Sequence, residues 1–544
     1  MANDLLTERD HPSRVVVVGA GWAGWGAAKA LCEAGVDVTL LDGMDDPTGS
    51  TPCTTASGKP FEAGTRGFWK DYPNINALTA ELGLSDVFTE FTTSAFWSPA
   101  GLEATAPVFG EENQWPSPLG QAFATIHNFK RLPVADRLSI AGLLVAMLDL
   151  NRSDAVFRQY DSIDALTLFK QLQISDRMID EFLRPILLVG LFKPPEQLSA
   201  AVTMELLYYY ALAHQDSFDV RWIKSKSIAE RLFAPLSQRL RDEYRLEVLG
   251  STLATRLNMS SDGRSVCSVE TRSLATGQSD LIDNVDAVVL AVGAKGMRAL
   301  MAKSPHCAQL APELKRAGSL GAIDVVSVRL WLDRTVPVAD PANVFSRFRA
   351  MKGAGATFFM LDQLQRDSQQ ELWGGSEPQG SVVASDFYNA TAIAELSDQQ
   401  IVDCLMGDLL PMAQPGFRDA QVVDQEVRRY PGSVSLFSPG SFHQRPPLET
   451  SLAPLVCAGD WVRMGQREFG AKGLCQERAY VCGLEAANSL LRRGIVIPTG
   501  SSQRQHRVIP IRADEPQVLL GRALNKMVMD PLESVGIRWP WLAG

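Results

Sequence analysis

Apolar and polar positions follow their clearest pattern near the amino terminus, where the chain reads as strand, turn, helix and strand. Residues 14–18 form an apolar, β-branched run, and a glycine-rich turn follows it directly. Helix-spaced apolar residues come next and end at Ala34–Gly35, and a second apolar run covers residues 36–41. Two apolar runs separated by a helix-spaced set predict a βαβ unit with parallel strands.

The turn of this unit carries the spacing GxGxxG, at Gly19, Gly21 and Gly24. Gly19 permits the tight turn, Gly21 lets a pyrophosphate approach the backbone, and Gly24 lets the helix pack close to the strand. The free N–H groups of the helix N-terminus then attract phosphate. Asp42 ends the second strand about 20 residues further on, where a carboxylate accepts bonds from ribose hydroxyls. A carboxylate repels a 2′-phosphate, so NAD and FAD both stay open, and the alternative is a glycine-rich turn in an ordinary βαβ unit.

The pattern changes along the rest of the chain. Residues 88–215 are dominated by helix-spaced apolar positions, residues 320–429 by strand-like runs, and strand–helix alternation returns over residues 455–491. We therefore expect an α/β fold, in which a discontinuous Rossmann-type domain is interrupted by a helical region and by a mixed α+β substrate domain. The expected boundaries are 12–87, 225–300 and 448–494 for the discontinuous domain, 88–224 for the helical insertion, 301–447 for the substrate domain and 495–544 for a C-terminal tail.

Three other stretches carry weaker signals. Leu138 to Leu150 is the longest apolar run, and it is shorter than the roughly 18 residues that a membrane span needs. It predicts either a buried core helix or a monotopic patch that dips into a bilayer. Residues 431–447 read as a loop. In the tail, Trp539 to Leu542 could dock either on the body of the protein or on a membrane.

Composition narrows the classes of function. The chain has 544 residues, is 46% hydrophobic and carries a net charge of −10, so a nucleic-acid partner is not expected. Its eight cysteines include no CxxC pair, which indicates reduced thiols in a cytosol-like compartment. Its six histidines include no HExxH cluster, so no metal site is expected.

A second informative stretch lies near the carboxyl end. A short strand over residues 455–458 runs into Gly459–Asp460–Trp461, and a helix with small residues is expected over residues 473–491. Asp460, at the end of a strand, can accept a bond from a sugar-like hydroxyl, and the helix N-terminus beyond it offers a second anion site. The alternative is a strand–helix unit that only closes the sheet.

Another candidate segment follows the first βαβ unit. Gly64 would let the backbone pass close to a flat ligand, and Arg66 could point at it. The alternative is a loop packed on the first domain. A helix is expected to follow, with Asn74 as its cap.

These motifs together resemble the flavin amine oxidase and phytoene desaturase superfamily. Residues 62–74, 220–222 and 229–236 are similar to the zeta-carotene desaturase branch. The resemblance implies that the Rossmann-type domain binds FAD, with pyrophosphate at the glycine turn and the adenosine ribose at Asp42. It also places Leu253 at the adenine, Asp460 near the ribitol and pyrophosphate, and Glu477 and Ala479 at the flavin end. The cofactor-binding residues that it implies are Gly19, Gly21, Gly24, Asp42, Gly49, Gly64, Arg66, Leu253, Gly459, Asp460, Glu477 and Ala479.

The resemblance also implies an activity. The expected reaction is hydride transfer from an allylic carbon of a hydrophobic isoprenoid or polyene to the flavin, as in a carotene desaturase or isomerase, with a quinone or another acceptor reoxidising the flavin. Peripheral contact with a membrane and a location in the cytoplasm or plastid stroma are further expectations. No catalytic residue is assigned. Arg66 replaces a histidine that is common in the desaturases, and Arg478 replaces a glycine of the family. Amine oxidation and a flavin-free escort of prenylated proteins stay open as alternatives.

Overall fold

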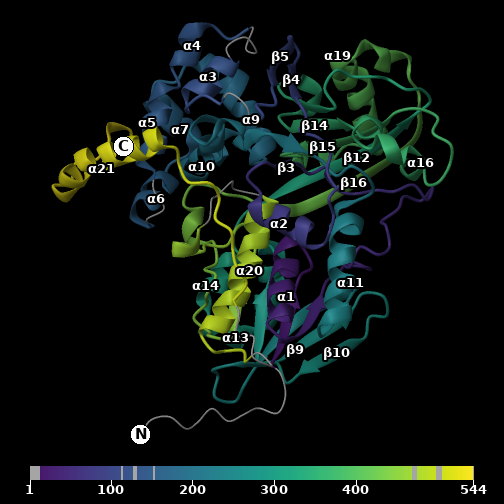
Figure 1. Cartoon of the computed structure of the whole chain (residues 1–544), viewed down its shortest axis with the longest axis vertical. Helices are drawn as coiled ribbons and strands as arrows, with labels where there is room; N and C mark the ends of the chain where they lie inside the picture. The colour runs from purple at the N-terminus through teal and green to yellow at the C-terminus, as the bar shows by residue number, and fades with distance from the viewer. Residues whose placement is uncertain are drawn as a thin grey trace.

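Five parallel strands form the centre of one lobe of the molecule, and a seven-stranded sheet lies in the other (Figure 1). The computed structural model describes residues 13–111, 114–125, 131–150, 154–468, 475–497 and 505–542. The first sheet has the order β17-β11-β1-β2-β7, so it combines strands from both ends of the chain. Its strands are β1 (Arg14–Val18), β2 (Asp37–Leu41), β7 (Leu246–Leu249), β11 (Ala287–Leu290) and β17 (Leu455–Cys457). The predicted α/β fold is confirmed.

Helices cover this parallel sheet, so its strands are buried and can be apolar throughout. Val15, Val16 and Val17 of β1 are fully buried. The helices of this lobe are α1 (Trp22–Glu33), α2 (Pro73–Glu81), α11 (Ala234–Glu243), α12 (Ala294–Lys303), α13 (Pro305–Leu310), α14 (Pro312–Ala317) and α20 (Gln476–Arg492). A three-stranded antiparallel sheet is attached to this lobe, formed by β8 (Thr252–Met259), β9 (Val266–Ser273) and β10 (Ser279–Asp283).

Helices α1 and α20 lie side by side although they come from opposite ends of the chain (Figure 1). A β-carbon on Gly483 of α20 would lie 2.0 Å from the carbonyl oxygen of Ala23 in α1. A β-carbon on Gly26 of α1 would lie 2.5 Å from the carbonyl oxygen of Tyr480. The two backbones therefore approach so closely that only glycine fits at both positions.

The seven-stranded sheet has the order β16-β12-β15-β14-β13-β4-β5 and is mixed, because β13 pairs with β4 in parallel and the other neighbours are antiparallel. Its strands are β4 (Ser94–Ser98), β5 (Gly101–Ala106), β12 (Ala322–Leu332), β13 (Ala342–Phe345), β14 (Gly355–Met360), β15 (Val382–Tyr388) and β16 (Val422–Ser435). Short helices lie on both of its sides. Helices α17 (Thr391–Ala394), α18 (Asp398–Cys404) and α19 (Leu410–Ala413) pack on one side, and α15 (Leu361–Leu364) and α16 (Gln369–Leu372) pack on the other.

Two features of this sheet differ from the expectation. Strands β4 and β5 come from residues expected in the helical insertion, because short strands without long apolar runs give little signal. The expected loop over residues 431–447 begins within β16, which continues through Pro431 to Ser435. Because β16 is an edge strand and its pairing with β12 shifts register nearby, the missing N–H of proline is tolerated there.

The helical region lies beside the second sheet, and a two-stranded ribbon of β3 (Phe68–Trp69) and β6 (Val220–Arg221) lies at its border. The helices are α3 (Leu119–Thr125), α4 (Val134–Leu138), α5 (Ala141–Asp149), α6 (Asp154–Asp161), α7 (Ala165–Gln171), α8 (Asp176–Met178), α9 (Arg184–Gly190) and α10 (Ala200–Ala211). The longest apolar run divides between α4 and α5. Its Leu143 and Met147 are buried, whereas Leu138 is exposed. Among the described residues, every helix is too short or too polar to cross a bilayer.

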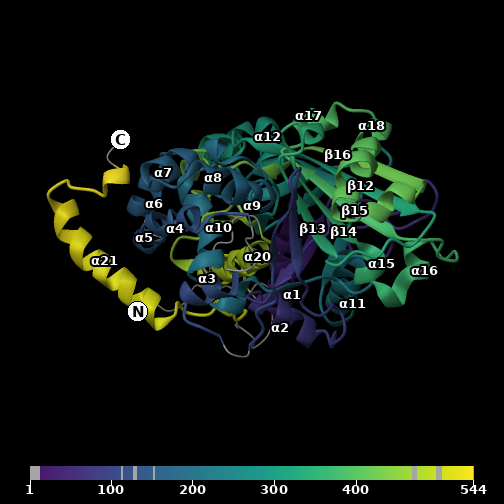
Figure 2. The ribbon, with the colours of Figure 1, turned by 90° about the horizontal axis from the view of Figure 1, so that it is seen from above.

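The C-terminal segment crosses the molecule and ends in α21 (Pro516–Ser534), a helix that the sequence pattern did not predict. Asn74 Nδ2 donates to the carbonyl of Ile509, and Arg512 pairs with Asp71 and Asp216. Figure 2 shows α21 at the edge of the molecule, beside the helical region. Beyond it, Trp541 Nε1 donates to the hydroxyl of Tyr160 at 3.0 Å, so Trp541 docks on the helical region.

Candidate active site

Of the three glycines in the turn after β1, two are required by close packing, and the third leaves room for a ligand. Gly19 has a φ of +105°, and a β-carbon on it would lie 2.3 Å from the carbonyl oxygen of Ala291. A β-carbon on Gly24 would lie 1.8 Å from the carbonyl oxygen of Gly19. Gly21 precedes the first turn of α1, and a β-carbon on it would meet no atom of the described residues within 4 Å. The turn is therefore built so that a ligand can approach the free N–H groups of α1.

Asp42 joins the glycine turn to the end of β2. Its Oδ2 accepts from the N–H of Ala20 and its Oδ1 from the N–H of Met44, each at 2.8 Å. An ionised carboxylate has about four acceptor sites, so capacity for sugar hydroxyls remains. Leu253 is 42% exposed. Its side chain lies over Gly43, and its Cδ2 would be 3.0 Å from a β-carbon on Gly43. Both positions thus lie at the same edge of the parallel sheet.

Gly459 and Asp460 reach that edge from the other end of the chain. The N–H of Ala291 donates to Val18 and the N–H of Ala458 donates to Leu290, which aligns the carboxyl ends of β1, β11 and β17. Only β11 separates Asp460 from the glycine turn, and neighbouring strands lie about 4.8 Å apart. Burial raises the pKa of Asp460 from its ordinary 3.8 to about 6, against the opposing charges of two arginines.

Arg478, in place of the glycine of the family, holds the chain that follows Asp460. Its side chain is 1% exposed, and it donates to the carbonyl oxygens of Asp460 at 2.5 Å and Val462 at 2.8 Å. It also forms an ion pair with Glu468. The guanidinium therefore ties residues 460–468 to the N-terminus of α20.

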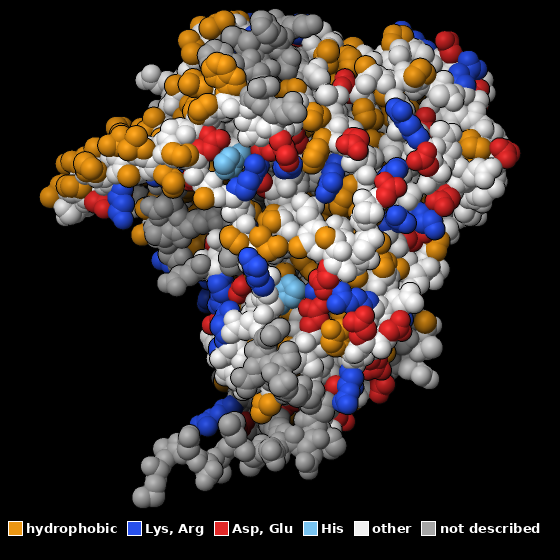
Figure 3. Space-filling model, viewed as in Figure 1, with side chains coloured by type: hydrophobic (Ala, Val, Ile, Leu, Met, Phe, Trp, Pro, Cys, Tyr) orange, Lys and Arg blue, Asp and Glu red, His pale blue; other side chains and the backbone are white. Residues whose placement is uncertain are grey.

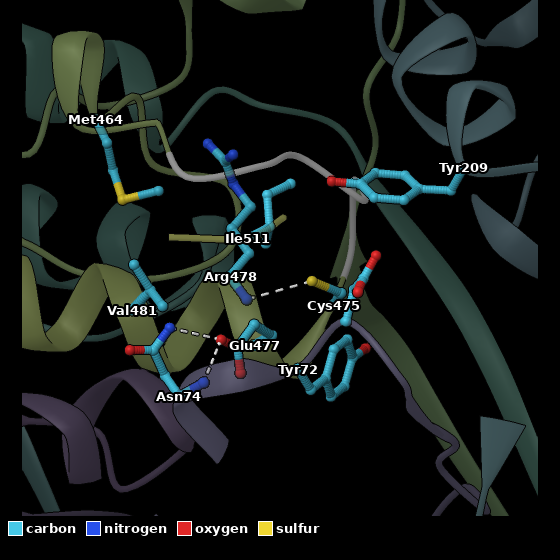
Figure 4. Close-up of a pocket in the computed structure, with 10 residues that line it drawn as sticks. Tyr72, Asn74, Tyr209, Met464, Cys475, Glu477, Arg478, Val481 and Ile511 are labelled. Atoms are coloured by element: carbon cyan, nitrogen blue, oxygen red, sulfur yellow. Dashed lines mark hydrogen bonds between the residues drawn. The ribbon is translucent and has the colours of Figure 1, made fainter. Parts of the chain in front are cut away.

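Glu477 connects α20 to α2 (Figure 4). Its Oε1 accepts from the N–H of Asn74 at 2.9 Å and from Asn74 Nδ2 at 2.7 Å, and its Oε2 accepts from the N–H of Ile75 at 3.0 Å. The expectation that Asn74 caps α2 is wrong, because Tyr72 occupies the cap position and Glu477 supplies the acceptors. Ala479, two residues further along α20, is half-buried.

Figure 4 shows the small pocket beside these residues. Tyr72, Glu477 and Arg478 line it from the lobe of the parallel sheet, Tyr209 lines it from α10, and Ile511 lines it from the C-terminal segment. The pocket is therefore a point where three parts of the chain meet.

The segment around Gly64 crosses the face of the second sheet. Gly64 has a φ of +74°, and a β-carbon on it would lie 4.0 Å from Asp386 Oδ1. The N–H of Thr65 donates to Asp386 at 3.3 Å, and Ser327 Oγ donates to it at 2.6 Å. Arg66 is exposed beside this group. The structure thus brings Gly64 and Arg66 to the junction of the two lobes.

Buried Asp386 and Arg329 form a charged cluster with half-buried Glu62, and sequence reasoning missed it. Arg329 donates to the carbonyl oxygen of Glu62 at 3.3 Å, and its buried Nε has no hydrogen-bond partner among the described residues. Burial raises the pKa of Glu62 and of Asp386, and it lowers the pKa of Arg329 to about 10. The sequence does contain a signal that could have revealed this cluster, because ionisable residues lie within the apolar strands β12 and β15.

The remaining predicted residue, Gly49, lies away from this cluster. It has a φ of +77°, and a β-carbon on it would lie 2.5 Å from the backbone of Ala229. Close packing accounts for a glycine at this position, and its role in cofactor binding stays a prediction. Among the described residues, no group of three or more His, Cys, Asp or Glu is placed to hold a metal ion.

The raised pKa of Asp460 predicts a pH-dependent stability of the flavin-free protein. The folded protein retains this proton between about pH 4 and pH 6, where the unfolded chain has lost it, so the stability contribution of Asp460 falls as pH rises through that range. A shift of about two units corresponds to about 3 kcal/mol. We expect Asp460→Asn to raise the unfolding temperature of the flavin-free protein more above pH 7 than near pH 5. An equal offset at both pH values would show that Asp460 ionises normally.

Comparison with known proteins agrees with this geometry. The chain matches the family described as flavin containing amine oxidoreductase over residues 23–492. It is 26% identical over 501 residues to a carotenoid phi-ring synthase of Streptomyces griseus, and the matched region covers 89% of this chain and 88% of that protein. It is 23% identical over 458 residues to a 15-cis-phytoene desaturase of Solanum lycopersicum, which covers 83% of this chain and 74% of that protein. Among solved structures, putrescine oxidase superposes with a TM-score of 0.59 at 16% identity, over 88% of this chain and 99% of that one.

The residues at the sheet edge fit FAD. The open space above Gly21 and the free N–H groups of α1 suit a pyrophosphate, and the carboxylate of Asp42 suits a ribose. Residues from both ends of the chain border the same edge, as an extended dinucleotide requires. The chain is an FAD-dependent oxidoreductase and belongs to the family of flavin-containing amine oxidoreductases.

Proposed function

We propose that the substrate is a hydrophobic isoprenoid or polyene of the carotenoid type. Relatives that cover most of this chain are named as a phytoene desaturase and a carotenoid phi-ring synthase, which supports a substrate of this class. When bound, FAD supplies two-electron acceptor chemistry, which suits hydride removal from an allylic carbon. A quinone is the proposed acceptor that reoxidises it.

The observation that carries this proposal is the apolar face of the second sheet. Trp331 of β12 and Val382 and Ala384 of β15 form one buried cluster with Trp222 and Phe359. Trp69, from the segment that carries Gly64, packs against the same cluster. Leu361 and Leu372 of α15 and α16 cover part of this cluster. The side of the sheet that carries Arg329 and Asp386 is therefore apolar and aromatic next to the charged cluster, which favours a hydrophobic substrate.

The charged cluster sets the proton affinity of its carboxyls. Arg66 and Arg329 both lie close enough to act electrostatically on the carboxyls of Glu62 and Asp386, and they lower the pKa of both. Burial has the larger effect and raises the pKa of both carboxyls, so an ionised carboxylate accepts a proton there more readily than a free one. The carboxyl of Asp386 can hold a proton at a pH at which a free aspartate has lost it. We propose it as the group that accepts the proton left after hydride removal.

Substrate-dependent bleaching of the bound flavin tests this function. The purified holoprotein would be mixed without oxygen with phytoene or a carotene in detergent, and separately with a panel of primary and secondary amines. We expect the polyene to bleach the visible flavin absorbance and an added quinone to restore it. Bleaching by an amine, with recovery in oxygen and no response to any polyene, would replace the proposal by amine oxidation.

A further inference from the structure

Helix α21 is docked on the body through polar side chains and through the buried side chains of Val518 and Met529. Arg522 donates to the carbonyl oxygens of Leu148 at 3.3 Å and Leu150 at 2.9 Å, at the C-terminal end of α5. Asn525 Nδ2 donates to Asp149 Oδ1 at 2.7 Å. The inner face of α21 thus satisfies carbonyl groups that the end of α5 leaves free.

The outer face of the same helix is also apolar, whereas the outer face of a surface helix is usually polar. The exposed apolar residues of α21 are spaced one, four and eight residues apart, so they lie on one side of the helix. Figure 3 shows hydrophobic side chains gathered over α21 and over the neighbouring helical region. The outward side chains are Leu519 (52% exposed), Leu520 (60%), Leu524 (51%), Met527 (71%) and Val528 (55%).

Adjacent segments extend this apolar surface. Ser117 is hydrogen-bonded to Glu515 and Gln517 at the start of α21, and Trp115 and Leu119 on either side of it are 58% and 55% exposed. Val134 and Leu138 of α4, which leads directly into α5, are 62% and 69% exposed. We call the exposed apolar residues of α21 together with these four the apolar face. Scattered apolar side chains are normal on a surface, but a group of this extent marks an interaction site.

We propose that the apolar face docks on the surface of a lipid bilayer, with α21 lying in the interface. The helix has 19 residues and is about 28 Å long. It does not meet the criteria for a membrane-spanning helix. A helix with one apolar side, polar residues on the other and a neighbouring tryptophan is suited to the boundary between acyl chains and headgroups.

Continuity with the active-site region favours lipid over a second copy of the chain. The segment that leads into α21 contributes Ile511 to the pocket of Figure 4, and Tyr208 of α10 donates to Asp514. The docking helix and the pocket wall are therefore parts of one short stretch. A polyene is stored in membranes because it is insoluble in water, so this argument rests on the proposed function.

Vesicle sedimentation tests the proposal without any assay of activity. The full-length holoprotein would be mixed with phosphatidylcholine vesicles, alongside a variant with Leu520→Gln and Met527→Gln. The matched control carries Leu281→Gln and Val423→Gln. Leu281 in β10 is 44% exposed and Val423 in β16 is 46% exposed, and both lie outside the apolar face. We expect the wild type and the control to sediment with the vesicles and the α21 variant to lose at least tenfold in bound fraction, with equal FAD content in all three. High salt should change this little, because apolar contacts are not screened.

Two results would overturn the proposal. One is wild-type protein that stays in the supernatant with the vesicles. The other is a dimer in light scattering that the α21 substitutions convert to monomer while no form binds vesicles, which would assign the apolar face to a second copy of the chain. If the protein binds vesicles but oxidises amines and no polyene, the apolar face would still be a membrane-binding surface, and only the proposed substrate would be rejected.

Discussion

Replacing Gly21 with valine should leave the protein folded and remove FAD from it. The position of the new β-carbon is open in the structure, so the folded chain tolerates it. The branched side chain would occupy the space through which a pyrophosphate approaches the N-terminus of α1. We expect FAD affinity to fall by more than a hundredfold, about 2.7 kcal/mol. Flavin released per chain after purification measures this, together with circular dichroism as the test of folding.

The matched control is Gly407→Val in the second lobe, where a β-carbon also meets no atom within 4 Å. It should keep both its fold and its flavin. A Gly21→Val protein that purifies with a full complement of FAD would show that the cofactor does not approach the glycine turn. Loss of the fold together with the flavin would show that Gly21 is a packing position like Gly24.

Replacing Gly483 with valine should have the opposite effect and damage the fold itself. Its β-carbon would lie 2.0 Å from the carbonyl oxygen of Ala23 and 2.8 Å from the backbone nitrogen of Ala27. These are backbone atoms of α1, so α1 and α20 would have to separate. Overpacking usually costs about 1–3 kcal/mol, and a clash with the backbone of two residues of α1 should reach or exceed the top of that range.

Thermal unfolding followed by intrinsic fluorescence measures this second effect. We expect Gly483→Val to be insoluble or to unfold well below the wild type, and Gly26→Val to behave alike because it addresses the same contact from α1. The Gly407→Val variant again serves as the control. A soluble Gly483→Val protein with the wild-type midpoint and bound FAD would mean that the two helices are not in backbone contact.

Local signals predicted the elements that we expect to bind the dinucleotide. The apolar run of β1, the three glycines after it and the acid that ends β2 are determined by neighbours in sequence, and the structure places them as expected. The strand that ends at Gly459 was predicted for the same reason. What these signals could not show is that β17 lies two strands from β1, because strand order depends on contacts between the ends of the chain.

The features that sequence reasoning missed depend on distant partners. Asp386 is significant because it accepts from Thr65, 321 residues away in sequence. Arg478 departs from the family pattern, and only the fold shows that it ties the chain after Asp460 to α20. Helix α21 escaped prediction because apolar residues lie on its outer as well as its inner side, and because two prolines, Pro516 and Pro531, lie within it.

Hydrogen–deuterium exchange of the flavin-free protein during titration with FAD tests most directly whether both ends of the chain hold one cofactor. Peptides covering residues 14–26 and 455–468 should both become protected, with the same dependence on FAD concentration and saturation at one FAD per chain. Protection of only one of these segments, or saturation of the two at different FAD concentrations, would contradict a single shared site.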